Sequence, residues 1–529
     1  MSIDFIFTAL FVVLARVCCA ANLLISPSPL PVCDLTLTRY NYLHLLIKVI
    51  KMAEVKEFPQ SFVRPWKELL QSRRDEQQDD FPSYYVNNID SLITTSSPKT
   101  LYVGTGYSIY TRALLPAILS AKHSVQLITC YWAASPSLDA IRDTFEKLAA
   151  ARIEANVKKP LRITIGFSSF GLFQKLFHPA SREGYVYEPS KWSKLGLPNQ
   201  QLLQNANIDL TVKSIFFTPL SVMHPKFVIV DGKRAWVPSC NVSWERWFEG
   251  CVEVEGAIVD RLLAFYDRVW GHDDEPQRRP GFQEDVQVDQ RAPNQLQVNS
   301  EVSATQSIDF PANGPVPTIF LPSPHHRNPR FSFFPFLSQT DPPMTPLNAA
   351  LLTLFNNAQR RITILTPNVT SWPVVESLLD ALARGVDVQI RTSKGMMLIE
   401  QLVTAGTTTS WCLRKFIQRY NALSNQPRSS DPEAQSPAPG KLEIFYYKQL
   451  DARRDQEDEP VVSHFKMTLV DDEYLVLGSG NMDRASWWTS QEIGLLFYVP
   501  GFQGQHLWND VLEKRAEVLF QSDHPKRLI

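Results

Sequence analysis

The order of expected helices and strands predicts an α/β fold built from two related halves. From about Leu101 onward, short apolar segments that fit strands alternate with longer segments of helical periodicity. This alternation is typical of helices packed on both faces of a mixed β-sheet. The same order returns after a polar stretch at 273–305, and both copies lead to the same short motif. We therefore predict two duplicated α/β/α sandwich halves of roughly 200 residues each.

Each expected element follows from its local pattern. The segment 124–132 is a nearly continuous apolar run and fits a buried strand, whereas 138–155 repeats its apolar residues with helical spacing. The first half is expected to contain helices at 112–122 and 138–155 and strands at 124–132, 161–167 and 208–218. The second half is expected to contain helices at 346–358 and 372–384 and strands at 361–367, 386–392 and 441–448.

Polar stretches with little periodicity predict loops and the limits of the domains. Loops are expected at 72–96, 423–440 and 451–460. The resulting division is a signal-like or untranslated segment at 1–51, an N-terminal extension at 52–100, a first half at 101–272, a linker at 273–305 and a second half at 306–529.

The overall composition narrows the class of protein. The formal net charge is −1 in 529 residues, so the basic excess usual in a dedicated nucleic-acid binder is missing. The seven cysteines show no paired spacing typical of a zinc site or a disulfide framework, and we interpret them as reduced core residues. No acidic cluster with metal-ligand spacing is evident. We therefore expect neither a metal nor another cofactor.

The N-terminus resembles a signal peptide only in part. The stretch 3–15 is apolar and 17–20 could form a cleavage site, but there is no basic start and Arg16 interrupts the pattern. A sequence typical of a soluble protein begins at Met52, which is the alternative start of the product.

Two copies of one motif carry the chemistry. The first copy is His224-Pro225-Lys226, four residues, Asp231, six residues and Pro238-Ser239-Cys240-Asn241. The second copy is His464-Phe465-Lys466, four residues, Asp471, six residues and Gly478-Ser479-Gly480-Asn481. Because the spacing from His to Asn is identical in both, coincidence is a poor explanation.

The residue types suit phosphoryl transfer. On a strand, a histidine and a lysine two residues apart point to the same face, so an imidazole and an ammonium enter one cleft. Two copies would supply a nucleophile and a proton donor for the leaving oxygen. We assign Lys226, Lys466, Ser239, Ser479, Asn241 and Asn481 to holding the phosphate.

At these residues, from about Leu101 to the C-terminus, the chain resembles the phospholipase D superfamily. The resemblance implies a metal-independent phosphodiester transfer through a phosphohistidine, in one active site shared by two halves related by pseudo-two-fold symmetry. By analogy with the family, we assign the role of nucleophile to His224 and that of acid to His464. Pro238, where the family has Gly, is the one departure within the signature.

The aspartates of the motif are expected to be structural. Asp231 and Asp471 lie seven residues after their histidines, and on a continuous strand an odd spacing points to the opposite face. Another group must then hold the second nitrogen of each imidazole. The resemblance implies an acidic residue a short distance after each Asn. We predict Glu253 and Glu492 for this role, with Glu255, on the same face as Glu253, as the fallback.

The favoured function is phospholipase D-type hydrolysis or transfer of glycerophospholipid head groups. The near-neutral charge and the aromatic residues after the motifs favour a lipid at a membrane surface over a nucleic acid. Those aromatic residues are Trp244, Trp247, Phe248, Trp487 and Trp488, for which core packing is an equal alternative. A cardiolipin synthase-like transferase, a nuclease of the same superfamily and an inactive lipid-binding scaffold remain as alternatives.

The expected location is intracellular, either cytosolic or at the periphery of a membrane. Asn241-Val242-Ser243 is an acceptor sequence for N-glycosylation, and Asn241 is an expected phosphate ligand. Asn368-Val369-Thr370 is a second such sequence, at the end of a core strand. A glycan at either position would damage the protein, which favours a compartment without glycosylation.

Overall fold

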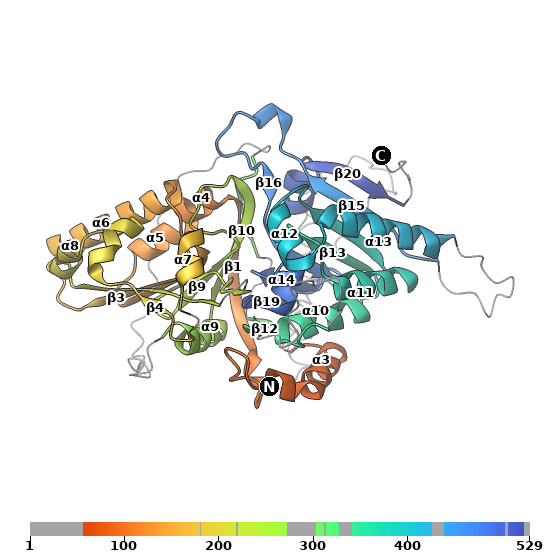
Figure 1. The fold of residues 1–529 in the computed structure, drawn as a ribbon, viewed down its shortest axis with the longest axis horizontal. Helices are drawn as coiled ribbons and strands as arrows, with labels where there is room; N and C mark the ends of the chain where they lie inside the picture. The colour runs from red at the N-terminus through yellow and green to blue at the C-terminus, as the bar shows by residue number, and fades with distance from the viewer. Residues whose placement is uncertain are drawn as a thin grey trace, which may run out of the picture. The chain divides into compact units, whose positions relative to one another are not determined.

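The computed structural model describes residues 57–179, 181–217, 221–271, 303–310, 314–326, 341–425, 438–502 and 506–522. The signal-like segment at 1–51, the alternative start at Met52 and most of the predicted linker lie outside these residues. The described part has the predicted α/β class, with helices packed on large mixed sheets (Figure 1).

The first half is built on a mixed sheet covered by helices. Across this sheet the strands are β11 (Gln306–Asp309), β1 (Ile93–Thr105), β10 (Trp247–Glu255), β9 (Arg234–Pro238), β8 (Phe227–Val230), β2 (Ser124–Tyr131), β3 (Leu161–Ser169), β5 (Ile208–Ser214) and β4 (Tyr185–Val186). Its helices include α4 (Gly106–Ile109), a π-helical turn (Tyr110–Leu114), α5 (Leu115–Leu119), α6 (Pro136–Glu154), α7 (Leu172–Phe177), α8 (Gln200–Asn205) and α9 (Ala257–Val269).

The second half has a corresponding sheet. Its strands, after the first part of β1, are β12 (Val316–Ser323), β19 (Glu492–Tyr498), β18 (Tyr474–Gly478), β17 (Met467–Val470), β13 (Arg361–Leu365), β14 (Asp387–Thr392), β15 (Leu442–Tyr447) and β20 (Ala516–Gln521). Its helices include α10 (Pro346–Asn357), α11 (Trp372–Ala383), α12 (Leu398–Ala405), α13 (Thr409–Ser424) and α14 (Arg484–Trp488).

The two sheets share one pairing pattern. In the first, the antiparallel hairpin β8–β9 lies between β10 and β2, and β2, β3 and β5 run parallel. In the second, the hairpin β17–β18 lies between β19 and β13, and β13, β14 and β15 run parallel. Both hairpins carry motif residues, so the pattern places the two motifs at equivalent positions.

Strand β1 connects the two halves. Its first residues pair with β12 of the second sheet, and its later residues pair with β10 of the first. The strand begins at Ile93, so part of the expected loop at 72–96 is extended structure. Phe81, Tyr85 and Leu92 from the same stretch are buried. The loop prediction was wrong only from Ile93 onward. Before that residue the segment has turns and short 3-10 turns, anchored by a few large apolar side chains among polar neighbours.

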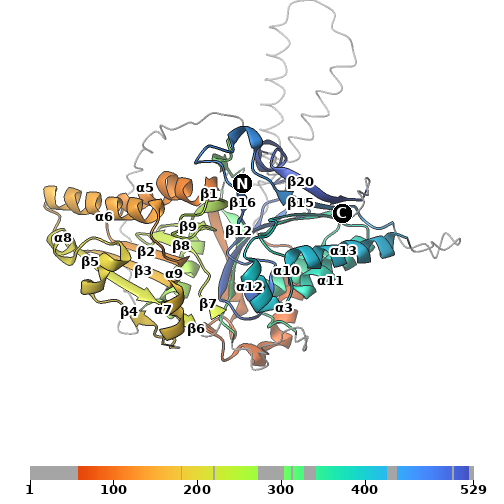
Figure 2. The same cartoon turned by 45° about the horizontal axis from the view of Figure 1, so that its top comes forward.

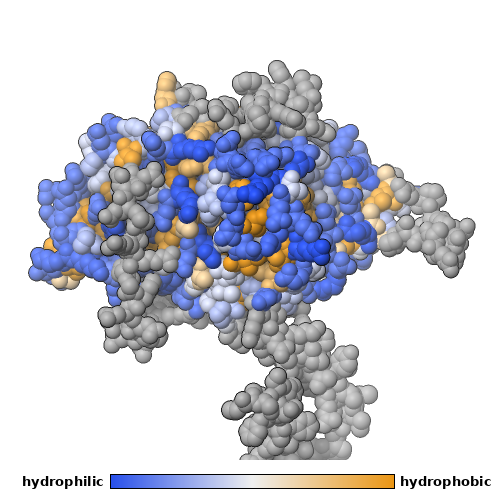
Figure 3. Space-filling model, turned by 90° about the horizontal axis from the view of Figure 1, so that it is seen from below, coloured by the Kyte–Doolittle hydropathy of each residue, from blue (hydrophilic) through white to orange (hydrophobic). Residues whose placement is uncertain are grey.

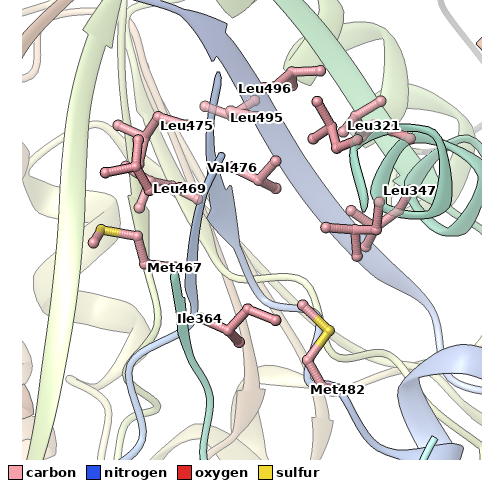
Figure 4. Packing of buried hydrophobic residues seen from close by; sticks show 14 of the residues in the cluster. Leu321, Leu347, Ile364, Met467, Leu469, Leu475, Val476, Met482, Leu495 and Leu496 are labelled. Atoms are coloured by element: carbon pink, nitrogen blue, oxygen red, sulfur yellow. The ribbon is translucent and has the colours of Figure 1, made fainter. Parts of the chain in front are cut away.

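The core of the second half lies between its sheet and α10. Figure 4 shows Leu347 of α10 close to Leu321 of β12 and Val476 of β18. A Cβ atom at Gly494 would lie 2.8 Å from Leu347, which is closer than packed carbon atoms approach. The glycine therefore allows α10 to approach the sheet, and the packing of α10 supports the strands that carry the second motif.

The N-terminal helix α3 (Gln60–Ser72) packs on the second half. The Trp66 indole donates a hydrogen bond to the backbone oxygen of Pro346 at 3.2 Å, at the start of α10. Figure 3 shows one face of the molecule on which hydrophilic side chains surround smaller apolar patches. Within the described ranges, every helix is too short or too polar to cross a bilayer.

Candidate active site

Each motif histidine lies beside the other half of the molecule. The backbone N–H of His464 donates to Phe248 O at 2.9 Å, and that of His224 donates to Gln491 O at 3.0 Å. The short strand β16 (Val462–Ser463), which precedes His464, runs parallel to β10. The same parallel arrangement joins Met223, next to His224, to Gln491. Each histidine is therefore positioned by the segment that carries a glutamate in the other half.

Those glutamates hold the imidazoles. The Nδ1 atom of His224 lies 2.8 Å from Oε2 of Glu492, and Nδ1 of His464 lies 2.8 Å from Oε1 of Glu249. Both glutamates are buried. A carboxylate accepts a hydrogen bond, so each Nδ1 carries the proton and each Nε2 keeps its lone pair. The pairing is reciprocal: a residue of each half orients the histidine of the other.

The structure corrects one predicted glutamate. Glu249, and not Glu253, faces His464; Glu253 accepts a hydrogen bond from the Tyr102 hydroxyl at 3.1 Å. The fallback Glu255 pairs with Lys99. Glu253 shares a strand face with Glu249 but lies four residues further along β10, roughly 13 Å away at the usual rise per residue.

Glu253 was wrongly predicted because the loops between the motif asparagine and the glutamate differ in length between the two halves. Glu492 follows Asn481 by eleven residues, whereas Glu249 follows Asn241 by only eight, because the second half inserts the short helix α14. The backbone shows the true equivalence: Ser239 N donates to Gly250 O as Ser479 N donates to Ile493 O, and each acceptor directly follows its glutamate. The search for the acid should therefore have allowed for a loop of variable length.

The motif serines bind these glutamates. The Ser479 hydroxyl donates to Glu492 at 2.5 Å, and the Ser239 hydroxyl donates to Glu249. Each serine oxygen also accepts a backbone N–H, from Ile493 at 3.1 Å and from Gly250 at 3.0 Å. In this structure both serine hydroxyls are therefore engaged in orienting the carboxylates, and their predicted role in holding phosphate stays a prediction.

The two lysines are buried at the same site. Lys226 Nζ donates to the backbone oxygen of His224 at 2.8 Å, and Lys466 Nζ lies 2.8 Å from Nε2 of His464. Burial lowers the pKa of Lys466 to about 7, against the opposing effect of Glu249, and Lys226 lowers it further. Each lysine also acts electrostatically on the histidine of the other half. The two motifs thus form one cluster of charged groups.

Burial also sets the charge of the imidazoles. It lowers the pKa of His464 to about 3 and that of His224 below its ordinary value, although the partner glutamates raise both. The pKa of Glu249 and that of Glu492 are lowered: burial alone would raise them, but the nearby histidines and lysines outweigh it. Near neutral pH the resting site therefore contains neutral imidazoles beside ionised carboxylates.

The asparagines differ between the halves. The Asn241 side-chain oxygen accepts the backbone N–H of Tyr131 at 3.3 Å. The Asn481 amide donates to Asp483 at 2.9 Å, and its oxygen is buried without a hydrogen-bond partner. The Ser486 hydroxyl donates to Glu492 at 2.6 Å and has no counterpart at Glu249 among the described contacts. The second half therefore has an additional donor at its carboxylate.

The motif aspartates lie away from the imidazoles. Asp471 accepts the backbone N–H groups of Gln359, Arg360 and Arg361 at 2.8–3.0 Å. Asp231 accepts the corresponding groups of residues 122–124 at the start of β2. Both aspartates have positive φ angles, +53° for Asp231 and +55° for Asp471. Each one ties the turn of its hairpin to the start of the neighbouring strand.

Aromatic side chains contribute to the surroundings of the site. The Trp247 ring centroid lies 4.8 Å from that of His464, and Trp244 is 58% exposed. Trp487 and Trp488 are buried core residues, as is Phe248. Among the described side chains, no group of three or more His, Cys, Asp or Glu residues could hold a metal ion.

Comparison with known proteins agrees with this geometry. Residues 351–510, which include the whole second motif, match the family model described as cardiolipin synthase, PLD-like domain. Over these residues the chain is similar to PLD-like domains. No curated protein sequence matches it significantly.

Three solved structures show a more distant likeness. Phosphatidylserine synthase from Haemophilus influenzae Rd KW20 is 14% identical, with 80% of this chain and 89% of that chain covered and a TM-score of 0.47. The phospholipase D family member Nuc from Salmonella typhimurium is 14% identical, covering 32% of this chain and 87% of its own, with a TM-score of 0.22. Polyphosphate kinase from Porphyromonas gingivalis is 11% identical, with coverages of 75% and 47% and a TM-score of 0.35. Scores below 0.5 say nothing about the substrate of this chain.

Proposed function

We propose that this chain is a phospholipase D-type phosphodiesterase and phosphatidyltransferase that acts on glycerophospholipid head groups through a phosphohistidine. The observation that carries the proposal is the reciprocal pairing of His224 with Glu492 and of His464 with Glu249. Two oriented imidazoles beside two buried lysines match the needs of an in-line displacement at phosphorus: a nucleophile, an acid and positive charge around the phosphoryl oxygens.

The first step forms the covalent intermediate. Nε2 of His224 donates its lone pair to phosphorus, and the bond from phosphorus to the head-group oxygen breaks. Two features favour His224 as the nucleophile: its side chain is 11% exposed against 2% for His464, and Lys466 lies against Nε2 of His464. Glu492 stabilises the positive charge that develops on the attacking imidazole.

The leaving oxygen needs a proton. His464 is neutral in the resting site because its pKa is about 3. The adjacent Lys466, with a pKa of about 7, carries a proton on Nζ, which lies 2.8 Å from Nε2 of His464. In the proposal, His464 passes this proton to the head group. In the second step, His464 accepts a proton from water or an alcohol, whose oxygen attacks phosphorus and releases His224.

Two features favour a lipid over a polynucleotide. The net charge of −1 gives no overall attraction to a nucleic acid. The matching family model is described by cardiolipin synthase, which favours a second candidate, transfer of a phosphatidyl group to the hydroxyl of another lipid. Hydrolysis and transfer to another lipid differ only in the molecule that attacks the phosphohistidine in the second step: water in the first case, a lipid hydroxyl in the second.

The test is a product analysis with the full chain. The protein is incubated, with EDTA present, with mixed phospholipids and ethanol, with phosphatidylglycerol, and in parallel with single-stranded DNA. We expect phosphatidylethanol, or cardiolipin from phosphatidylglycerol, and an acid-labile phosphoryl adduct on a histidine. His224→Asn is the matched control. Cleavage of DNA alone would indicate a nuclease, lipid binding without turnover would indicate an inactive scaffold, and dependence on a divalent ion would contradict the histidine mechanism.

We also propose that the working protein resides where chains are not glycosylated. Asn368 is 1% exposed, and its side-chain oxygen accepts a hydrogen bond from Gln401, so a glycan there is incompatible with this fold. Mass spectrometry of the native protein tests the location. A glycan on Asn368, together with a mature N-terminus near Ala21, would contradict it.

A further inference from the structure

Helix α12 exposes its apolar side chains and buries a polar one. Leu398 is 45% exposed, Ile399 80%, Leu402 53% and Val403 51%. The buried residue of the helix is Gln401, at 3% exposure. A surface helix of a globular protein normally has the opposite arrangement, with its apolar face against the core.

Specific hydrogen bonds fix this orientation. The Gln401 amide nitrogen donates to the Asn368 side-chain oxygen at 2.9 Å. The Gln401 oxygen accepts the backbone N–H of Thr409 at 2.6 Å and the Thr409 hydroxyl at 3.0 Å. Rotating the helix to bury its apolar face would break these buried hydrogen bonds, so the exposed face is a consequence of the local structure.

Helix α12 lies beside the active site. Helix α12 packs on α14, which begins three residues after Asn481 (Figure 1). Figure 2 shows α12 on the side of the second half that is turned toward the first half. The carboxyl group of Glu400 on α12 interacts electrostatically with Asp483, just after the second motif, and with Lys175 on α7 of the first half. Helix α12 is therefore close to the second motif and to α7 of the first half, and its apolar face lies on the outer side of the helix.

Two exposed aromatic residues lie on helices next to α12: α7, whose Lys175 interacts with Glu400, and α13, which follows α12 in the chain. Phe177, at the end of α7, is 83% exposed, and Trp411, at the start of α13, is 53% exposed. Between residues 394 and 415 the charged side chains are three basic and one acidic. The exposed basic residues are Lys394, Arg414 and Lys415, and the ammonium of Lys415 lies 5.4 Å from the Trp411 ring centroid.

We propose that the apolar face of α12, with Trp411 and Phe177, docks the protein on an anionic phospholipid surface. The proposal rests on the proposed function and names the surface from which that site takes its substrate. Short apolar helices flanked by tryptophan and basic residues bind at the boundary between acyl chains and head groups, where the basic residues meet anionic phosphates.

A membrane fits this face better than a protein partner. The exposed residues are aliphatic and aromatic with basic residues at the border, which suits anionic head groups above apolar chains. A second copy or another protein seated on α12 would also lie close to the second motif, whereas a bilayer seated there supplies the lipid that the site is proposed to cleave.

The binding test uses the full chain and vesicles of phosphatidylcholine with or without one quarter phosphatidylglycerol. Co-sedimentation is compared for wild type, for Ile399→Asp/Leu402→Asp, and for Ile153→Asp, a control at a 45% exposed isoleucine on α6. We expect the double variant to lose at least tenfold in affinity, the control to match wild type, and anionic lipid to strengthen binding in a salt-dependent way. Circular dichroism verifies that both variants fold.

A second measurement leaves the fold undisturbed. Brominated phospholipids quench tryptophans that enter the bilayer, so they should quench wild-type fluorescence more than that of Trp411→Phe. Turnover is measured on vesicles and on a monomeric short-chain phospholipid. We expect the double variant to lose turnover on vesicles only and to stay within twofold of wild type on the soluble substrate.

The outcomes are distinct. Unchanged vesicle binding by the double variant, or equal quenching of wild type and Trp411→Phe, would overturn the docking proposal. So would a wild-type protein that ignores vesicles and forms an oligomer that the double variant dissociates, because α12 would then be a protein interface. Normal docking without turnover of any phospholipid would overturn the proposed function and leave the docking proposal supported.

Discussion

Replacing Glu249 by glutamine should nearly abolish activity, whereas replacing Glu253 should not. Glu249 holds His464 at 2.8 Å in a buried pair. At an effective dielectric constant of about 20, unit charges at this separation interact by roughly 6 kcal/mol. Glutamine keeps a hydrogen-bond acceptor but loses the charge, so the loss should be about 3–5 kcal/mol, or roughly 10²–10⁴-fold in kcat.

The control lies on the same strand face. Glu253→Gln also exchanges a carboxylate for an amide, but this side chain contacts only the Tyr102 hydroxyl among the groups discussed above. Its kcat should stay within about twofold of wild type. The assay is steady-state turnover of a soluble phosphodiester, with thermal unfolding of each variant as a control for folding. Equal losses in both variants, or a folded Glu249→Gln protein with most of its activity, would refute the reasoning.

Four further predictions test the site. His224→Ala and His464→Ala should each remove all measurable turnover, and activity surviving in either folded variant would contradict a shared site. The kcat/KM of wild type should fall above about pH 7, because Lys466 loses its proton and positive charge there. It should persist below pH 6.5, because burial lowers the pKa of His224 from its ordinary value and keeps the imidazole neutral. A profile that is flat to pH 9 would contradict this prediction. Asp471→Asn should lower the free energy of unfolding by about 1–3 kcal/mol, because three backbone N–H groups lose their anionic acceptor. The folded variant should stay active. A stable but inactive variant would contradict the structural role of Asp471. Ser486→Ala should lower kcat about tenfold with little change in KM, because Glu492 loses one donor; an unchanged kcat would exclude a positioning role.

The sequence alone contained the fold class and the positions of the two motifs. Alternation of apolar strands and periodic helices is a local signal, so the predicted bounds of β2 and α6 agree with the structure to within two residues at each end. The identical spacing of the motif around His224 and His464 is also readable without a structure. Strand parity predicts that Asp471 points away from the imidazole, but the structure gives a different reason for the separation: Asp471 lies in the turn after β17, with a positive φ angle, and not on a continuous strand.

Partners that meet across the two halves could not be predicted in this way. Glu249 orients an imidazole that lies 215 residues away, and its position depends on a loop that is three residues shorter than its counterpart before Glu492. The residue spacing within one half cannot predict that Glu249 pairs with His464, because the distance between these two side chains depends on how β16 aligns with β10. The segment around Phe81 was missed for a related reason: its burial depends on contacts with distant strands.

The exposed face of α12 is the clearest case of a feature decided by tertiary structure. Its sequence, read as a helix, predicts burial of leucine, isoleucine and valine. The hydrogen bonds of Gln401 with Asn368 and Thr409 instead turn that face to the surface. The motif residues are enough to predict the chemistry of each half. Which residues of the two halves act together depends on tertiary contacts, because those contacts join groups far apart along the chain.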